Sequence, residues 1–125
     1  MTTTKKSGAV HKKFGKPDET RKFELWRLDL LNIGGGAVGL LEFHPGWRWS
    51  THIKPSAGTE WCEAPHFQYH ISGTLRVRMA DGTEFDAVPG DVTMLPSGHD
   101  AWVVGDEAVV AIDWQGASVW ARPEG

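Results

Sequence analysis

The sequence has little cysteine and no long apolar run, and each scarcity excludes a class of protein. A single cysteine among 125 residues cannot form an internal disulfide, which is typical of a protein in a reducing compartment. No apolar stretch approaches the roughly 20 residues that a membrane-spanning helix needs. The N-terminus also lacks the apolar segment of a signal peptide. We therefore expect a cytoplasmic protein with no membrane partner.

Basic residues are scarce outside the first part of the chain. Residues 1–22 carry a formal charge of +5, whereas residues 23–125 carry −8. Because nucleic-acid binding depends on a basic surface that neutralises phosphates, the acidic body excludes nucleic acid as the main partner. Residues 1–20 show almost no apolar periodicity. We interpret them as a basic, partly disordered N-terminal tail that precedes one domain at 21–125.

Turn-forming residues, in contrast, are abundant. The chain has 15 glycines and 7 prolines, and they separate roughly eight to ten short apolar runs at regular spacing. Asp81-Gly82 is the strongest hairpin signal among these turns. No stretch shows a sustained helical period with caps. The pattern predicts an all-β sandwich or barrel in a single domain.

Two of the predicted strands carry histidine in an unusual pattern. In residues 66–71, the alternation places His66, Gln68 and His70 on one face and large apolar side chains on the other. In residues 47–53, aromatic and polar side chains also alternate, which predicts a strand with His52 in step with its polar neighbours. A strand with this pattern is either half exposed or lines a polar cavity.

The histidines raise the question of a metal site. Neutral imidazole is a common ligand of divalent transition metals, and three protein ligands with a vacant position are typical of a catalytic metal. On spacing alone, however, a strand histidine is more often a hydrogen-bonded, half-buried side chain. Both interpretations stand on this pattern.

Two motifs carry a resemblance to a known family. Residues 90–98 (GDVTMLPSG) have a glycine, five residues and then Pro-x-Gly, as the second cupin motif begins. Gly46 is followed by five residues and His52, as the first motif begins, and His66 is followed by six residues and Gly73, as that motif ends. Together with PDETR, GWRWS, APHF and PSGHDAWVVGDE, these motifs make the sequence resemble small single-domain bacterial cupins over about residues 20–120. The resemblance implies a double-stranded β-helix, or jelly-roll, barrel that is often a homodimer with a metal inside.

The resemblance implies a metal set with departures from the family pattern. His52 matches the first cupin histidine, Lys54 replaces the second, and His66 stands where the family has glutamate. The last family histidine falls at Ala101, so His99 serves only if its loop bends. The implied set is His52, His66 and His99, holding a divalent ion such as Fe, Zn, Ni or Mn. Cys62 either reaches this ion or is a small buried side chain.

Other side chains near these ligands are candidates for substrate chemistry. Gln68 and His70 are the candidate catalytic residues, predicted either to be extra metal ligands or to orient the other ligands. His70 is also available for proton transfer, as is Tyr69, although Tyr69 is expected to face away. A second group is predicted to bind a small molecule through charge or aromatic contact: Arg48, Trp49, Lys54 and Trp102. The tryptophans fit ordinary core filling or a dimer face as well.

The expected function follows from this site. We expect a metal-binding cupin with a small-molecule pocket and, as an enzyme, a non-haem metal-dependent dioxygenase. Two alternatives remain open on the sequence: a non-catalytic small-molecule-binding or sensory module, and an isomerase of cupin type.

Overall fold

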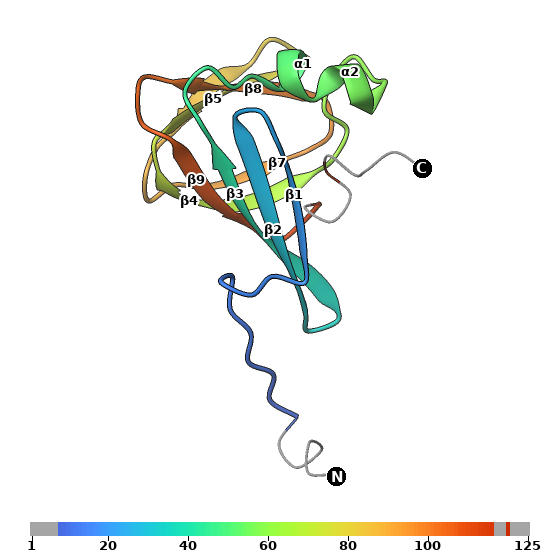
Figure 1. Cartoon of the computed structure of the whole chain (residues 1–125). Coiled ribbons are helices and arrows are strands. Elements are labelled where there is room, and N and C mark those ends of the chain that lie inside the picture. Colours follow the sequence, from blue (N-terminus) through green and yellow to red (C-terminus); the bar gives the residue numbers. More distant parts are fainter. Residues whose placement is uncertain (1–7, 117–119, 121–125) are drawn as a thin grey trace.

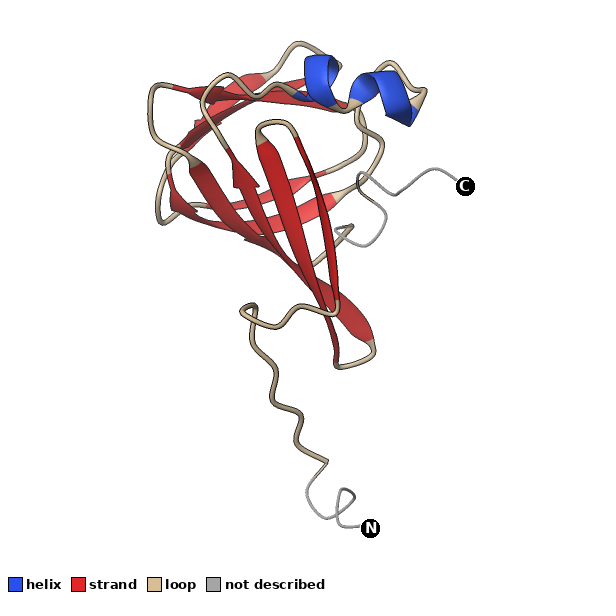
Figure 2. Ribbon diagram, viewed as in Figure 1, coloured by secondary structure: helices blue, strands red, loops and turns tan. Residues whose placement is uncertain are grey.

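A computed structural model describes residues 8–116 and Trp120 (Figure 1). In this part, the chain forms nine strands and two one-turn helices: β1 (Glu19–Phe23), β2 (Trp26–Ile33), β3 (Gly36–Phe43), α1 (Trp49–His52), α2 (Lys54–Ala57), β4 (His66–Ser72), β5 (Thr74–Met79), β6 (Glu84–Ala87), β7 (Val92–Leu95), β8 (His99–Val104) and β9 (Val109–Asp113). Figure 2 shows how strongly strand dominates the fold. The predicted all-β barrel is confirmed.

The strands form two antiparallel sheets that enclose the core. One sheet has six strands in the order β1-β2-β3-β9-β4-β7, and the other has three in the order β6-β5-β8. Neighbours such as β4 and β9 lie far apart in sequence, which is typical of jelly-roll topology. Large apolar side chains point between the sheets, and the most deeply buried include Leu28, Leu41, Val77 and Val109.

The turn residues act as the sequence predicts. Gly82 has a φ of 95° in the turn between β5 and β6, and the Asp81 carboxylate accepts a hydrogen bond of 2.9 Å from the Thr83 amide. Such a turn favours glycine because a side chain strains the left-handed region. The predicted hairpin at Asp81-Gly82 is confirmed.

The strand predicted over residues 47–53 is wrong, because this segment enters helix α1. Trp49 and Ile53 are 2% and 3% exposed, so the buried positions follow the four-residue spacing of a helix. The Asp100 carboxylate of β8 accepts a hydrogen bond of 3.1 Å from the Ser50 amide in the first turn. Helix starts need such an acceptor, and here it comes from a strand 50 residues away. The alternating pattern of residues 47–53 therefore does not give a strand, because the folded chain supplies a distant acceptor that caps a helix here.

The segment before β1 contacts the large sheet. The Asp18 amide donates to the Leu30 carbonyl at 2.8 Å, and Lys12 forms an ion pair of 2.8 Å with Asp18. Strand β1 begins at Glu19, within the predicted tail. The division into tail and domain stays a prediction, and residues 1–7 lie outside the described part. No helix among the described residues is long and apolar enough to cross a membrane.

Candidate metal centre

Three buried side chains meet inside the barrel near one end of β4 and β8. Cys62, His66 and His99 each offer a ligand atom, and these atoms all lie within 4.8 Å of one another. Each of the three residues is 3% exposed. Cys62 is held beside the start of β8, since its amide donates to the His99 carbonyl at 2.8 Å. The fold thus brings a thiol and two imidazoles together in the buried interior.

The orientation of His66 is set by a carboxylate on the neighbouring strand. Its Nδ1 donates a hydrogen bond to Asp113 Oδ2. Because Nδ1 carries the proton, the lone pair of a neutral His66 lies on Nε2, which is 3.9 Å from Cys62 Sγ. A carboxylate behind a histidine in this way fixes the tautomer of metal-ligating imidazoles and raises their basicity.

Asp113 is held in place by four donors. Besides His66, its carboxylate accepts hydrogen bonds from the Gln68 side-chain amide at 3.2 Å, the Phe67 backbone amide at 3.2 Å and the Gln115 backbone amide at 2.9 Å. The residue is 0% exposed. The donors stabilise a negative charge beside the cluster.

His99, like His66, has the lone pair of its neutral imidazole on Nε2. Its Nδ1 lies 3.0 Å from the Pro96 carbonyl oxygen, which can only accept, so the proton is on Nδ1. Burial, and next the nearby His66, lower the pKa of His99 to about 4. The imidazole is therefore neutral near pH 7, the form that binds a metal.

Cys62 is a neutral thiol without a metal. Burial raises its pKa to about 11, because the low-dielectric interior disfavours the thiolate. A bound divalent ion reverses this preference, since a coordinating thiol loses its proton. The thiol is thus inert on its own and a strong ligand when a cation is present.

The cluster opens onto a small cavity. The cavity has a volume of about 20 Å³ and is lined by three groups of residues: the ligand candidates, Gln68, and apolar side chains (Leu41, Phe43, Trp47, Trp49, Leu95, Ala101 and Trp120). This volume accommodates one water or ion, because a water needs at least about 10–15 Å³. Gln68 Nε2 donates to Asp113, which leaves Gln68 Oε1 buried with no hydrogen-bond partner among the described residues. An unsatisfied oxygen on the wall fits a site that takes a cation or its water.

His52 is not brought to this cluster. It lies at the end of α1, where its Nδ1 is 3.1 Å from both the backbone nitrogen and the carbonyl oxygen of Arg48. Because the segment is helical, His52 lies at the end of α1 and not on the predicted strand. Of the expected set, the structure brings together His66 and His99, with Cys62 in the third place.

Gln68 and His70 take different positions along β4. Gln68 lines the cavity and contacts Asp113, whereas His70 is absent from the cavity wall. His70 is 1% exposed, and its Nε2 is 2.9 Å from Thr93 Oγ1. Burial lowers the pKa of His70, so it is neutral near pH 7.

The predicted substrate-binding residues do not share one pocket. Trp49 lines the cavity. Arg48 stacks its guanidinium 4.0 Å above the Trp102 ring and forms an ion pair of 3.2 Å with Asp100. Lys54 pairs with Glu60 at 3.3 Å near the surface. Three of the four residues therefore lie outside the cavity wall.

The sequence pattern did not predict two residues of the site, Asp113 and Trp120. Asp113 ends an alternating inward series, Val109, Ala111 and Asp113, and an acid at an inward position was the signal for it. Trp120 packs against Phe43 and lines the cavity.

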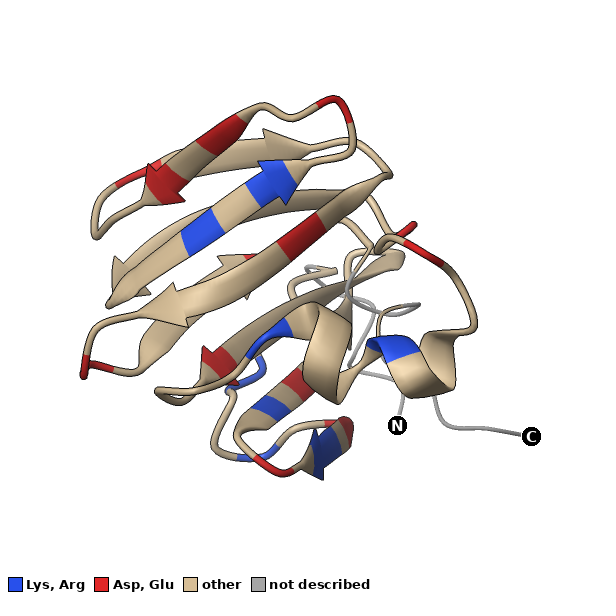
Figure 3. Ribbon diagram, turned by 90° about the horizontal axis from the view of Figure 1, so that it is seen from above, with Lys and Arg blue, Asp and Glu red and all other residues tan. Residues whose placement is uncertain are grey.

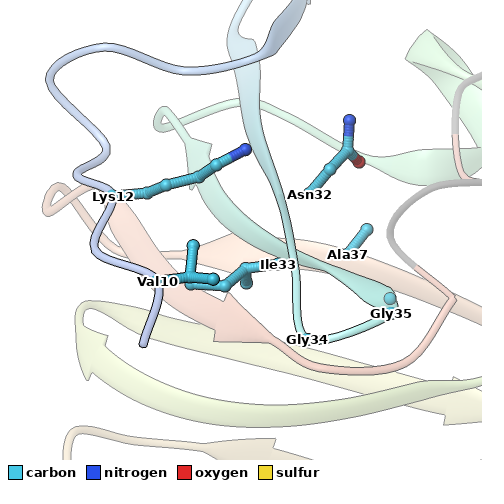
Figure 4. A pocket seen from close by; sticks show the side chains of 8 residues that line it. Val10, Lys12, Asn32, Ile33, Gly34, Gly35 and Ala37 are labelled. Atoms are coloured by element: carbon cyan, nitrogen blue, oxygen red, sulfur yellow. The ribbon is translucent and has the colours of Figure 1, made fainter. Parts of the chain in front are cut away.

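A larger hollow of about 630 Å³ lies elsewhere, between the N-terminal segment and the β2–β3 hairpin. Figure 4 shows the side chains that line it, including Val10, Lys12, Asn32 and Ile33. The Lys12 amine is already paired with Asp18, and among the residues that the structure describes no histidine, cysteine or acid lines the hollow.

Comparisons with known proteins support the fold. No protein-family model matches the chain, and no curated protein matches it. Among solved structures, it is similar to oxalate decarboxylase from Lactobacillus farciminis in a formate complex, with a TM-score of 0.58 and 17% identity over 82% of this chain and 32% of that chain. It is also similar to oxalate decarboxylase from Bacillus subtilis, studied for its Mn(II) centres. There the TM-score is 0.57 and the identity is 24%, over 78% of this chain and 27% of the decarboxylase. A third similar structure is a cupin-like protein from Thermotoga maritima. Its TM-score is 0.54 and its identity is 18%, over 78% of this chain and 72% of that protein.

The chain spans about a third or less of the length of the two decarboxylases. The likeness therefore concerns one domain and its fold. The resemblance to small cupins is confirmed at this level.

Proposed function

We propose that this small cupin binds one divalent transition-metal ion through Cys62, His66 and His99 and uses it on a small molecule. The observation that carries the proposal is the convergence of three buried ligand atoms within 4.8 Å. Each imidazole has its Nδ1 held by an oxygen acceptor, which leaves both Nε2 lone pairs available to one ion. The Cys62 Sγ to His66 Nε2 distance of 3.9 Å compares with about 3.5 Å between sulfur and nitrogen ligands of a tetrahedral zinc ion.

The charges of the site support the same proposal. The Cys62 thiolate and the buried Asp113 carboxylate carry two negative charges, and two neutral imidazoles add none. A divalent cation makes the whole group neutral. A second buried negative charge is costly unless it is paired, so the ion offsets the charge that Cys62 gains when it loses its proton.

The donor set favours zinc or iron(II) over manganese or magnesium. Thiolate and imidazole are softer ligands than the carboxylates and carbonyls that suit Mn and Mg. The decarboxylase from Bacillus subtilis has Mn(II) centres, whereas this site has sulfur in its donor set. We expect that difference to change both the metal and the chemistry.

The activity proposed for the loaded site is that of a non-haem dioxygenase. When bound, the ion supplies a Lewis acid and, if redox-active, a centre for oxygen chemistry. Three protein ligands leave a position open, as in catalytic sites. Gln68 Oε1 lies on the cavity wall without a partner among the described residues and can accept a hydrogen bond from a ligand. Leu41, Phe43 and Trp49 keep bulk water out and favour a small apolar reactant.

A non-catalytic metal or sensory module is the second candidate. It is favoured by the cavity volume of about 20 Å³, which leaves no room for an organic substrate unless the wall moves. An isomerase has less support, because His70, its candidate base, does not line the cavity. Arg48, Lys54 and Trp102 stay candidates for binding at the outer surface.

The test is metal content with matched variants. We expect one zinc or iron per chain in protein purified without chelator, and sulfur and nitrogen neighbours in its X-ray absorption spectrum. His66→Gln and His99→Gln are each expected to lose most of the metal. His52→Gln is the control, because His52 lies outside the cluster, and it is expected to retain the metal.

Three results would count against the proposal. These are an absence of metal after reconstitution with Zn²⁺ and Fe²⁺, unchanged content in both cluster variants, or loss in the His52 control alone. Oxygen uptake by the iron form supports the dioxygenase, whereas a metal-loaded protein without turnover supports the module.

A further inference from the structure

Polar side chains lie on opposite sides of the two sheets. On the three-stranded sheet they face outward, and Arg76 of β5 forms an ion pair of 2.7 Å with Asp86 of β6, with both side chains more than a third exposed. Figure 3 shows basic and acidic segments on these adjacent strands. On β4 of the large sheet the pattern is reversed, because His66, Gln68 and His70 face inward and are 1% to 4% exposed. Their polar atoms therefore need partners inside the barrel.

Two of these inward polar atoms have no partner. Gln68 Oε1 and His70 Nδ1 are both buried without a hydrogen bond to any of the described residues. The Gln68 amide is oriented by Asp113, to which its Nε2 donates at 3.2 Å, so Oε1 can only accept. His70 Nε2 lies 2.9 Å from Thr93 Oγ1, a hydroxyl that suits either tautomer of the imidazole. One strand thus carries two unsatisfied atoms at neighbouring inward positions.

The strand pairing directs the His70 ring toward Gln68. Thr93 is the register partner of Gln68, yet its hydroxyl contacts the imidazole of His70. The ring therefore leans along β4 toward the level of Gln68. On the other side of β4, the partner of His70 is Ala111, whose methyl group takes little space beside the ring. Side chains two residues apart on a strand are about 7 Å apart at their bases, and two hydrogen bonds through one water span about 5 Å.

We propose that one water molecule is bound inside the barrel between Gln68 Oε1 and His70 Nδ1, and that His70 acts through this water as a positioning residue of the metal centre. A water donates to Gln68 Oε1, and it either donates to His70 Nδ1 or accepts from it, so it satisfies both tautomers. Buried waters typically bond two to four polar groups that are otherwise unsatisfied. The two orphaned atoms provide such a site.

The water completes a chain of hydrogen bonds across the sheet. The chain starts at the partly exposed Thr93 of edge strand β7, which contacts His70. The water joins His70 to Gln68, and Gln68 donates to Asp113. Asp113 in turn accepts from His66, a ligand of the proposed ion. Without the water, no described residue holds Gln68 Oε1, and the amide is free to turn away from Asp113.

The test is a matched pair of variants of the full chain, His70→Asn and His70→Leu. Asparagine keeps a polar atom near the position of Nδ1, whereas leucine fills the space without one. Nuclear Overhauser contacts between water and the Gln68 side-chain amide protons detect the bound water in ¹⁵N-labelled protein. We expect the contacts in wild type and His70→Asn and their loss in His70→Leu. Spectra of the metal-free and the zinc-loaded chain test the water whether or not zinc binds.

Zinc affinity, measured against a chromophoric chelator, tests the positioning role, which rests on the proposed function. We expect His70→Leu to lower the affinity by about three- to tenfold, less than the 10- to 100-fold usual for a direct partner of a ligand. His70→Asn should stay within about twofold of wild type. A packing role gives the opposite order, because leucine fills the interior better than asparagine does.

The outcomes separate the two proposals. A wild type without water contacts at Gln68 overturns the water site, as do contacts that persist in His70→Leu. Equal zinc affinity in wild type and His70→Leu, or a larger loss in His70→Asn, overturns the positioning role of His70. A wild type that binds no zinc contradicts the proposed function, and the contacts in the metal-free chain still decide the water site.

Discussion

His66 of β4 and Asp113 of β9 are joined by a hydrogen bond from imidazole Nδ1 to carboxylate Oδ2, although 47 residues separate them in sequence. The pairing of β4 with β9 places Asp113 opposite Gln68, which donates to the same carboxylate. Asp113 therefore acts through His66 and Gln68, and it is a positioning residue of the proposed metal site.

Replacing this carboxylate should weaken metal binding. We expect Asp113→Asn to lower zinc affinity by about 10- to 100-fold, the usual effect of losing the partner of a ligating histidine. Competition with a chromophoric chelator measures this change. Asp86→Asn removes a surface carboxylate that pairs with Arg76 and is the control. Equal affinity in wild type and Asp113→Asn would show that Asp113 does not orient the ligand.

Metal binding should release a proton from Cys62. The thiol has a pKa of about 11, so it is protonated at pH 7 and deprotonated in the complex. Below that pKa, the affinity for zinc should therefore increase about tenfold for each unit by which the pH rises. His99, with a pKa of about 4, adds no proton above about pH 5. Calorimetry of zinc binding in buffers of different ionisation enthalpy counts the protons, and Cys62→Ser should release one fewer.

The metal-free protein should lose stability in mild acid. Folded His99 has a pKa of about 4 and that of His70 is also lowered, both mainly by burial. An unfolded histidine titrates near 6.5, so the unfolded chain gains protons first as the pH falls from about 6.5 toward 4. The free energy of unfolding is therefore highest above about pH 6.5. By pH 5, the lowered pKa of His99 alone reduces it by about 2 kcal/mol.

Urea unfolding at pH 7.5 and pH 5 tests this dependence. The difference in unfolding free energy between the two pH values should shrink in His99→Gln and, separately, in His70→Gln. Replacing His11, which lies on the exposed N-terminal segment, should leave the difference unchanged. A pH-independent wild type between 7.5 and 5 would contradict the expectation.

Removing Trp120 should open the cavity. Trp120 packs edge-on against Trp26 with ring centroids 5.1 Å apart, and Arg21 donates to its carbonyl at 2.8 Å. Trp120→Ala should lower the free energy of unfolding by about 3–5 kcal/mol, as large core truncations do. It should also speed removal of bound metal by a chelator, measured by stopped flow. Trp114→Ala, at a position 49% exposed, should change neither quantity by a comparable amount.

Local sequence determined most of the strands and the inward histidines. Alternation in residues 66–71 correctly placed His66, Gln68 and His70 on one face, because the strand period of two is a property of the backbone itself. Asp81-Gly82 determined its hairpin in the same way, since few residues adopt the turn's left-handed backbone. These features need no distant partner.

Only the tertiary structure decided which side chains form the site. His52 left the expected set because Asp100, 50 residues away, accepts the Ser50 amide and supports a helix where the pattern predicted a strand. Cys62 and Asp113 joined His66 because strand pairing and a backbone bridge to His99 bring them there. Contacts between residues so far apart depend on how the sheets close, and no period along the chain encodes that closure.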